Sequence, residues 1–212
     1  LGAKVTVTDL KSDEQLKDIL SEIKPYIHQY FLGYHPEDVT EYDLAVVSPG
    51  VPIHSPFVKK LRSEKIHLIG EIELAYLNCK GHFIGITGTN GKTTTTSLIG
   101  AIFEAANRNH FVVGNIGIPA VSKALEADES TMMITELSSF QLETIENFRA
   151  EIALIMNLTP DHLDRHGDME GYRAAKARIF ENQTSTDSLV LNYDDLMVRE
   201  LSHCAKGKVF TF

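Results

Sequence analysis

One stretch of sequence decides the fold class of this chain: HFIGITGTNGKTT, residues 82–94. It begins as a β-branched and aromatic run typical of a buried strand, and a stretch with apolar residues at helical spacing follows it. The glycines between strand and helix let the backbone turn tightly, so that successive N–H groups point inward and bind phosphate oxygens. The helix N-terminus adds a partial positive charge at the same place. The stretch therefore predicts a site for nucleotide phosphates.

Within this loop, Lys92 is expected to bridge the β- and γ-phosphates, and the hydroxyl of Thr93 or Thr94 to coordinate Mg²⁺. The pattern is a shorter variant, TGxxGKTT, because Ile86 stands where the standard phosphate loop has its first glycine. A helix N-cap that contains Gly and Thr by chance is the alternative, but it leaves the order of strand, loop, Lys-Thr pair and helix unexplained. We expect ATP and Mg²⁺ to bind at the loop residues Gly88, Thr89, Asn90, Gly91, Lys92, Thr93 and Thr94.

Short strand-like runs alternate with helix-length stretches on both sides of the loop. We expect strands at residues 3–8, 44–47, 66–69, 82–87, 110–113, 132–135, 152–156, 188–191 and 208–211. We expect helices at residues 13–23, 56–64, 93–107, 119–127, 140–148, 170–182 and 195–203. Such alternation is typical of an α/β fold with mostly parallel sheets, in which functional loops gather at the carboxyl ends of the strands.

A polar gap at residues 78–81 separates two such series. We expect residues 1–80 to form a Rossmann-like unit and residues 81–212 to form a P-loop-type central ATPase unit. The first unit contains no GxGxxG turn, and the chain opens with Leu1-Gly2, which resembles a helix C-terminus leading into a strand. We therefore expect both units to be truncated, with the first βα unit missing.

The composition excludes several classes of protein. With 20 Lys and Arg against 29 Asp and Glu, the 212-residue chain carries a formal charge of −9, which disfavours non-specific binding to nucleic acid. No apolar run approaches the roughly 18 residues of a membrane-spanning helix, and the two Cys are too few for a disulfide framework. We expect a cytoplasmic protein that acts as a monomer, without membrane insertion and without a nucleic-acid partner.

Two further segments carry candidate metal ligands. Glu136 ends a buried-type strand, where a carboxylate beside a phosphate loop is well placed to hold Mg²⁺; the alternative is that it stabilises the N-terminus of the next helix. The segment NLTPDHLDRH, residues 157–166, has two His and two Asp within six residues after a strand. We favour a Mg²⁺ site assisted by one imidazole over zinc, which prefers softer ligands, and a polar surface loop is the alternative.

Lys176 interrupts an apolar helix face. Tyr172, Lys176 and Ile179 stand at i, i+4 and i+7, so they share one side of the helix predicted at residues 170–182. A lysine that snorkels to solvent is one explanation. The other is a lysine aimed at the phosphate site, or one whose amine is kept neutral by burial and is available for chemistry.

Five segments in this order, TGTNGKTTT, GNIGIP, ELSSFQLE, NLTPDHLDRH and YRAAKARI, resemble the Mur ligases of peptidoglycan synthesis. The segment ELSSFQLE resembles the members that add D-glutamate to UDP-N-acetylmuramoyl-L-alanine. The resemblance implies an ADP-forming ligase: ATP phosphorylates the substrate carboxylate, and the amine of D-glutamate attacks the acyl phosphate. Another amide ligase of this fold, such as a folylpolyglutamate synthetase, and a nucleotide-binding module without chemistry are the alternatives.

The resemblance also implies roles for single residues. One Mg²⁺ would be held by Thr93 and Glu136, and a second by His162 and Lys176, with Lys176 carrying CO₂ as a carbamate. Catalysis would depend on Lys92, His162 and Lys176. The muramoyl-alanine part would be contacted by Asn115, Ser138, Gln141 and His162, and the uridine diphosphate by Asp9, Lys11 and Gly50. Because the family continues into a C-terminal amino-acid-binding domain, we expect this segment alone to bind nucleotide poorly and not to complete ligation.

Overall fold

The structure is a computed structural model that describes residues 2–212; Leu1 lies outside the described residues. The chain divides into two compact units. The smaller unit runs as far as Ala45 and includes His54–His67, and the larger contains Val46–Ile53 and Leu68–Phe212.

The smaller unit is built on two short parallel strands, β1 (Thr6–Asp9) and β2 (Gln29–Leu32), which pair with Thr6 opposite Gln29. The helix α1 (Lys17–Ile23) connects them. The helix α2 (Pro56–Ser63) begins where the Ser55 hydroxyl accepts a hydrogen bond from the Val58 amide, which satisfies one of its free N–H groups. The strands β3 (Leu44–Val47) and β4 (His67–Gly70) form a separate pair.

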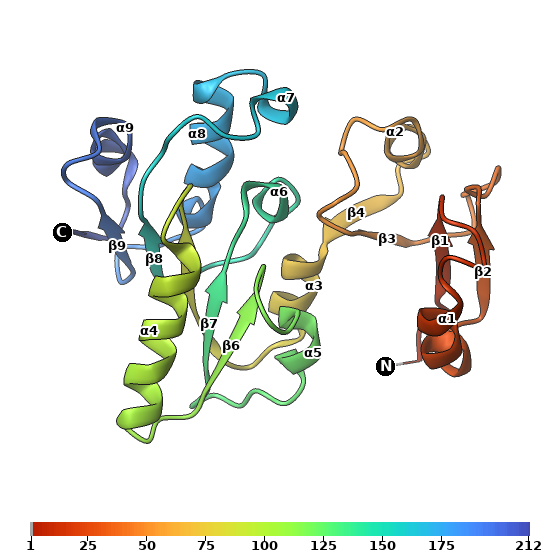
Figure 1. Cartoon of the computed structure of the whole chain (residues 1–212), viewed down its shortest axis with the longest axis horizontal. Helices are drawn as coiled ribbons and strands as arrows, with labels where there is room; N and C mark the ends of the chain where they lie inside the picture. Colours follow the sequence, from red (N-terminus) through yellow and green to blue (C-terminus); the bar gives the residue numbers. More distant parts are fainter. Residues whose placement is uncertain (1) are drawn as a thin grey trace. The chain divides into compact units, whose positions relative to one another are not determined.

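The larger unit contains a parallel sheet of six strands in the order β10-β9-β8-β5-β7-β6. Its strands are β5 (His82–Thr87), β6 (His110–Gly114), β7 (Met132–Glu136), β8 (Ile152–Ile155), β9 (Ser188–Leu191) and β10 (Lys208–Thr211). Its helices are α3 (Glu71–Asn78), α4 (Lys92–Ala105), α5 (Ala120–Ala124), α6 (Ser139–Leu142), α7 (Leu163–His166), α8 (Met169–Ala177) and α9 (Leu196–Arg199), shown in Figure 1. The predicted α/β class with a mostly parallel sheet is confirmed.

Alternate residues of the central strands face opposite layers of helices. On one face, Ile84 and Ile86 of β5 and Ile134 of β7 pack against Ile99 and Phe103 of α4. On the other face, the neighbouring strand residues join a larger apolar core with helices α3, α5, α6, α8 and α9. The period-two alternation of a strand buried on both faces therefore produces a three-layer unit.

The strand order changes direction at β5. The next strand along the chain, β6, lies at the edge beyond β7, whereas β8 pairs with the opposite side of β5. Loops diverge to both sides at such a point, and a crevice for ligands forms outside the carboxyl ends of the strands. The glycine-rich loop follows β5, so the fold brings it to this position.

Most predicted elements are confirmed, with four differences. The strand β2 and the helices α3 and α7 were not predicted, and the helix expected at residues 140–148 ends after four residues, at Leu142. Its continuation is prevented because the buried carboxylate of Glu73 accepts hydrogen bonds from the backbone N–H groups of Glu146, Asn147 and Phe148, at 2.8–2.9 Å. These groups are thereby satisfied outside a helix.

Candidate active site

Two glycines shape the loop between β5 and α4. Gly88 has a φ of +145°, and a Cβ on it would lie 2.8 Å from the Cβ of Met156. Gly91 caps α4 in the left-handed conformation, with a φ of +84°. Side chains at these positions would be strained or would clash, so the loop geometry depends on both glycines.

The loop is fastened to the segment that follows β8. The amide of Asn90 donates to the side-chain oxygen of Asn157 at 2.8 Å, and the side-chain amide of Asn157 donates to the Asn90 carbonyl at 3.0 Å. The backbone N–H of Thr89 donates to the Asn157 carbonyl. No role for Asn157 was predicted from the sequence, although a polar residue directly after the strand predicted at residues 152–156 is a recognisable signal.

Lys92 lies over this loop. Its ammonium donates to the carbonyl oxygens of Gly88 and Thr89, at 3.0 and 2.8 Å. As the first residue of α4, it places a positive charge at the helix N-terminus, beside the backbone amides of the loop. Lysine, helix terminus and loop amides form the arrangement that stabilises bound phosphate.

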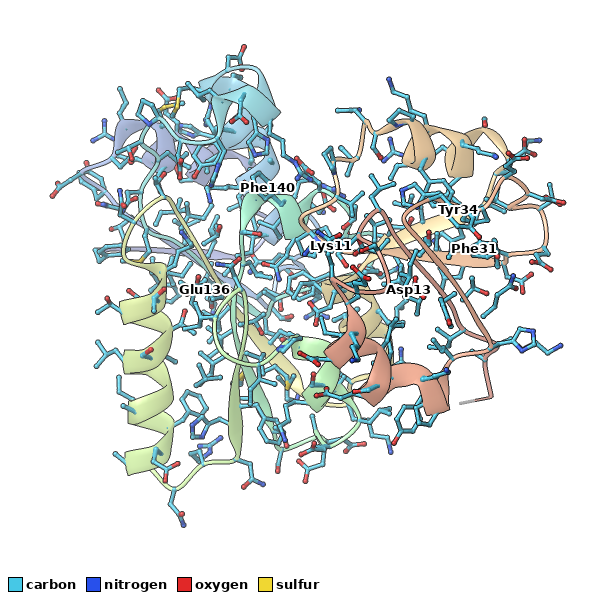
Figure 2. All side chains as sticks on the ribbon, turned by 45° about the vertical axis from the view of Figure 1, so that its right-hand side comes forward. Lys11, Asp13, Phe31, Tyr34, Glu136 and Phe140 are labelled. Atoms are coloured by element: carbon cyan, nitrogen blue, oxygen red, sulfur yellow. The ribbon has the colours of Figure 1, made fainter. Side chains whose placement is uncertain are left out.

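Glu136 joins three segments at the end of β7. It is only 1% exposed, and its two carboxylate oxygens accept hydrogen bonds from the Thr93 hydroxyl and the Asn115 side-chain amide, each at 2.9 Å. Figure 2 labels Glu136 in this unit. The helix α6, which follows, is capped by Ser138 instead. A hydroxyl and a carboxylate beside the loop are hard oxygen ligands that fit Mg²⁺.

Lys176 is buried against the start of the same loop. It is 2% exposed, and its ammonium donates to the Gly88 carbonyl at 2.9 Å and to the Thr87 hydroxyl at 3.3 Å. The predicted shared face is buried, since Tyr172 and Ile179 are each 1% exposed, and the snorkelling alternative is wrong. Burial and the nearby charge of Lys92 lower the pKa of Lys176 to about 7. A substantial fraction of its amines is therefore neutral and nucleophilic near neutral pH.

Tyr172 connects this lysine to the loop. The Lys176 ammonium lies 4.7 Å from the centre of the Tyr172 ring, and the Tyr172 hydroxyl lies 3.3 Å from that of Thr89. The helix α8 therefore contacts the phosphate loop through two side chains, one turn apart.

The two histidines of residues 157–166 have different surroundings. His162 has a φ of +50°, and its half-exposed ring lies 3.5 Å from an Asp161 oxygen and packs against Phe140. His166 is buried and bonds the Ser139 hydroxyl at 2.9 Å, and burial lowers its pKa. Among residues 2–212, no three His, Cys, Asp or Glu side chains are grouped to hold a metal ion. The segment thus does not form a metal cluster by itself.

The remaining candidate residues occupy three places. Ser138 and Gln141 form a reciprocal capping box at the start of α6. In the smaller unit, the amide of Lys11 donates to the Asp9 carboxylate at 2.8 Å, and the Lys11 side chain, which Figure 2 labels, belongs to an exposed residue. Gly50 lies in an exposed turn closed by a hydrogen bond from the Val51 amide to the Ser48 carbonyl.

Comparison with known proteins identifies the family. The family profile described as "Mur ligase middle domain" matches residues 86–212, and the chain belongs to the Mur ligase family. It is 51% identical to a UDP-N-acetylmuramoylalanine–D-glutamate ligase of Clostridioides difficile (strain 630), over 100% of this chain and 48% of that protein. It is 53% identical to the ligase of the same description from Alkaliphilus oremlandii, over 95% of this chain and 45% of that protein. The chain spans about half the length of the curated relatives it matches.

Solved structures share the fold at lower identity. A UDP-N-acetylmuramate:L-alanyl-gamma-D-glutamyl-meso-diaminopimelate ligase from Neisseria meningitides matches with a TM-score of 0.64 and 17% identity, over 100% of this chain and 70% of that one. MurF ligase from Thermotoga maritima, in complex with ADP, matches with a TM-score of 0.52 and 15% identity, over 84% and 51%. Among residues 2–212, no helix has both the length and the apolar character needed to cross a membrane.

Proposed function

We propose that the full-length protein is an ADP-forming ligase that joins D-glutamate to UDP-N-acetylmuramoyl-L-alanine in the cytoplasm, acting as a monomer. One observation carries the proposal: the phosphate loop, the buried carboxylate of Glu136 and the buried amine of Lys176 meet at one end of the sheet. The similarity of about half of all residues to two proteins described as this ligase supports the choice of substrates.

The loop residues would bind and align the ATP phosphates. Two anions, a carboxylate and a triphosphate, must approach each other in such a reaction, so their charge must be neutralised. Lys92, the helix N-terminus and the backbone amides of residues 88–94 supply positive potential for this purpose. The hydrogen bonds of Asn157 to Asn90 hold the loop in place before the nucleotide arrives.

Thr93 and Glu136 would hold one Mg²⁺, and His162 and Lys176 would serve a second. When bound, Mg²⁺ supplies charge neutralisation at the transferred phosphoryl group. The lysine would need a carbamate to become an anionic ligand. Its burial beside Lys92 favours the neutral amine, which is the form that reacts with CO₂, and this supports the assignment.

The substrate side of the site would be formed by Asn115, Ser138, Gln141 and His162 for the muramoyl-alanine part, with Asp9, Lys11 and Gly50 for the uridine diphosphate. Asn115 already donates to Glu136, so its segment, the GNIG turn, is held beside the carboxylate. His162 is half exposed and therefore accessible to a ligand.

The test is a ligation assay with the full-length protein, ATP, Mg²⁺ and the UDP-linked substrate, offered D-glutamate or other amino acids. We expect ADP and the dipeptide product only with D-glutamate, and a loss of activity when CO₂ is removed. Turnover with a folate and glutamate instead would indicate the folylpolyglutamate synthetase alternative. ATP binding without turnover under any of these conditions would indicate a module without chemistry.

A further inference from the structure

Arg165 is a charged side chain that the proposed reaction does not use, although it forms hydrogen bonds to several distant groups and packs on an aromatic ring. It lies in α7 and is largely buried, with 14% of its side chain exposed. Its guanidinium forms a double interaction with Glu143, from Nη2 at 2.5 Å and from Nε at 3.2 Å. Such fork-shaped pairs orient the guanidinium rigidly.

The same guanidinium reaches a turn more than a hundred positions away in the sequence. Its Nη1 donates to the Pro49 carbonyl at 3.1 Å, and its Nη2 donates to the Val51 carbonyl at 3.4 Å. These carbonyls flank Gly50. The turn, residues 48–51, follows the carboxyl end of β3, where loops of α/β proteins bind ligands. Arg165 therefore fixes a turn that has only one backbone hydrogen bond of its own, from Val51 to Ser48.

Arg165 also packs against the aromatic ring beside His162. Its guanidinium carbon lies 4.0 Å from the centre of the Phe140 ring, labelled in Figure 2, and that ring lies 4.8 Å from the ring of His162. The Arg165 guanidinium thus contacts both the turn around Gly50 and the Phe140 ring, which packs against His162.

We propose that Arg165 is a positioning residue. It holds the 48–51 turn and the Phe140 ring in fixed positions relative to each other and thereby sets the affinity for the nucleoside-diphosphate sugar. The inference rests on the proposed function, which assigns Gly50 and His162 to that substrate. It concerns binding of the sugar nucleotide rather than binding of ATP, because the phosphate loop makes its own contacts to Asn157, Glu136 and Lys176.

The first test is Arg165→Lys in the full-length protein. Lysine keeps the charge beside Glu143 but cannot also reach both carbonyls with a single ammonium. We expect KM for UDP-N-acetylmuramoyl-L-alanine to rise about 10-fold, while KM for ATP and kcat change by less than about 2-fold. A merely structural residue would instead lower the active fraction or both affinities together, and that result would overturn the proposal, as would an unchanged KM.

Arg149→Lys is the matched control. Arg149 forms a comparable pair with the buried carboxylate of Asp187, at 2.6 Å, and its guanidinium also donates to Thr184 rather than to the turn or toward Phe140. We expect both KM values to match those of the unsubstituted enzyme. An equal rise of KM for the sugar nucleotide in this control would show a non-specific effect and would contradict the proposal.

Two further measurements keep the proposal testable if the lysine variant is unstable or the reaction differs. In the double variant Arg165→Met with Glu143→Gln, no unpaired buried charge remains, and the KM effect should persist. Amide hydrogen exchange on the full-length protein should show faster exchange at Val51 in Arg165→Lys, with the 88–94 loop unchanged. If the unsubstituted enzyme does not ligate, the proposed function fails. The exchange measurement still tests whether Arg165 holds the turn, because unchanged protection of the Val51 amide in Arg165→Lys would overturn that role.

Discussion

In the larger unit, the candidate side chains of Glu136 and Lys176 are buried and bond partners from distant segments, whereas in the smaller unit the candidate side chain of Asp9 bonds a near neighbour in the sequence. Glu136 and Lys176 are almost inaccessible and are bonded across the sheet. Asp9 instead bonds the amide of Lys11, two residues along, and the Lys11 side chain is exposed. Preorganised polar groups in a buried site contribute more to catalysis than exposed ones. We therefore expect chemistry to depend on the larger unit and substrate affinity to depend partly on the smaller.

The largest expected effect is that of Lys92→Ala in the full-length protein. Removing the charge that lies over the loop should lower ATP turnover by about 10²- to 10³-fold, because Lys92 supplies the positive charge at the N-terminus of α4, whereas Lys176 donates to Gly88 from α8. Steady-state ADP release measures this. Lys123→Ala, which removes a surface lysine paired with Glu126, should leave turnover unchanged. Normal turnover in Lys92→Ala would disprove the phosphate-loop assignment.

Substitutions of two buried carboxylates of the larger unit should have different effects: one should mainly lower activity and the other should mainly lower stability. Glu136→Gln should lower ligation about 10- to 100-fold by weakening Mg²⁺ binding, with little change in the free energy of unfolding. Glu73→Gln replaces one of the two accepting oxygens with an NH2 donor, so at least one backbone N–H group of residues 146–148 loses its acceptor, and the free energy of unfolding should fall by about 2–3 kcal/mol. Activity at several Mg²⁺ concentrations and urea denaturation test the pair. If both variants lowered the free energy of unfolding equally, the assignment of Glu136 to Mg²⁺ binding and of Glu73 to structural support would be wrong.

The buried amine of Lys176 should make stability depend on pH. Burial lowers its pKa from the ordinary 10.5 to about 7. Between these values the unfolded chain binds a proton that the folded chain does not, so the free energy of unfolding should rise with pH, by up to about 1.4 kcal/mol per pH unit. Below pH 7 both states are protonated and the contribution is constant. Urea denaturation at pH 7 and 9 should show this rise relative to Lys176→Met, and parallel curves would argue against a buried neutral amine.

The smallest effects are expected in the smaller unit. Asp9→Ala and Lys11→Ala should each raise KM for the UDP-linked substrate by about 3- to 10-fold and leave KM for ATP unchanged, since exposed polar contacts contribute little individually. Asp13→Ala, an exposed acidic residue of the same segment, is the control (Figure 2). A large loss of kcat in Asp9→Ala would show that the smaller unit takes part in the chemistry. The assignment of chemistry to the larger unit alone would then be wrong.

Local patterns predicted much of the larger unit. The strand, glycine-rich loop and helix around Lys92 were predictable because each has a short-range signature in composition and spacing. The inward face of Lys176 followed from helical periodicity. The partners of these groups were not predictable: the bond from Asn157 to Asn90 joins segments 67 positions apart, and nothing in either segment alone indicates it.

The amino-acid sequence by itself determined the α/β class, the phosphate loop, the carboxylate at the end of β7 and the lysine on an apolar face, because these depend on periodicity and on contacts between near neighbours. Tertiary structure alone decided where the helix after Ser138 ends, which turn Arg165 holds and how far the pKa of Lys176 falls. Each of these depends on burial and on hydrogen-bond partners that come from distant parts of the chain. A backbone N–H group or a charge removed from water must find a partner there.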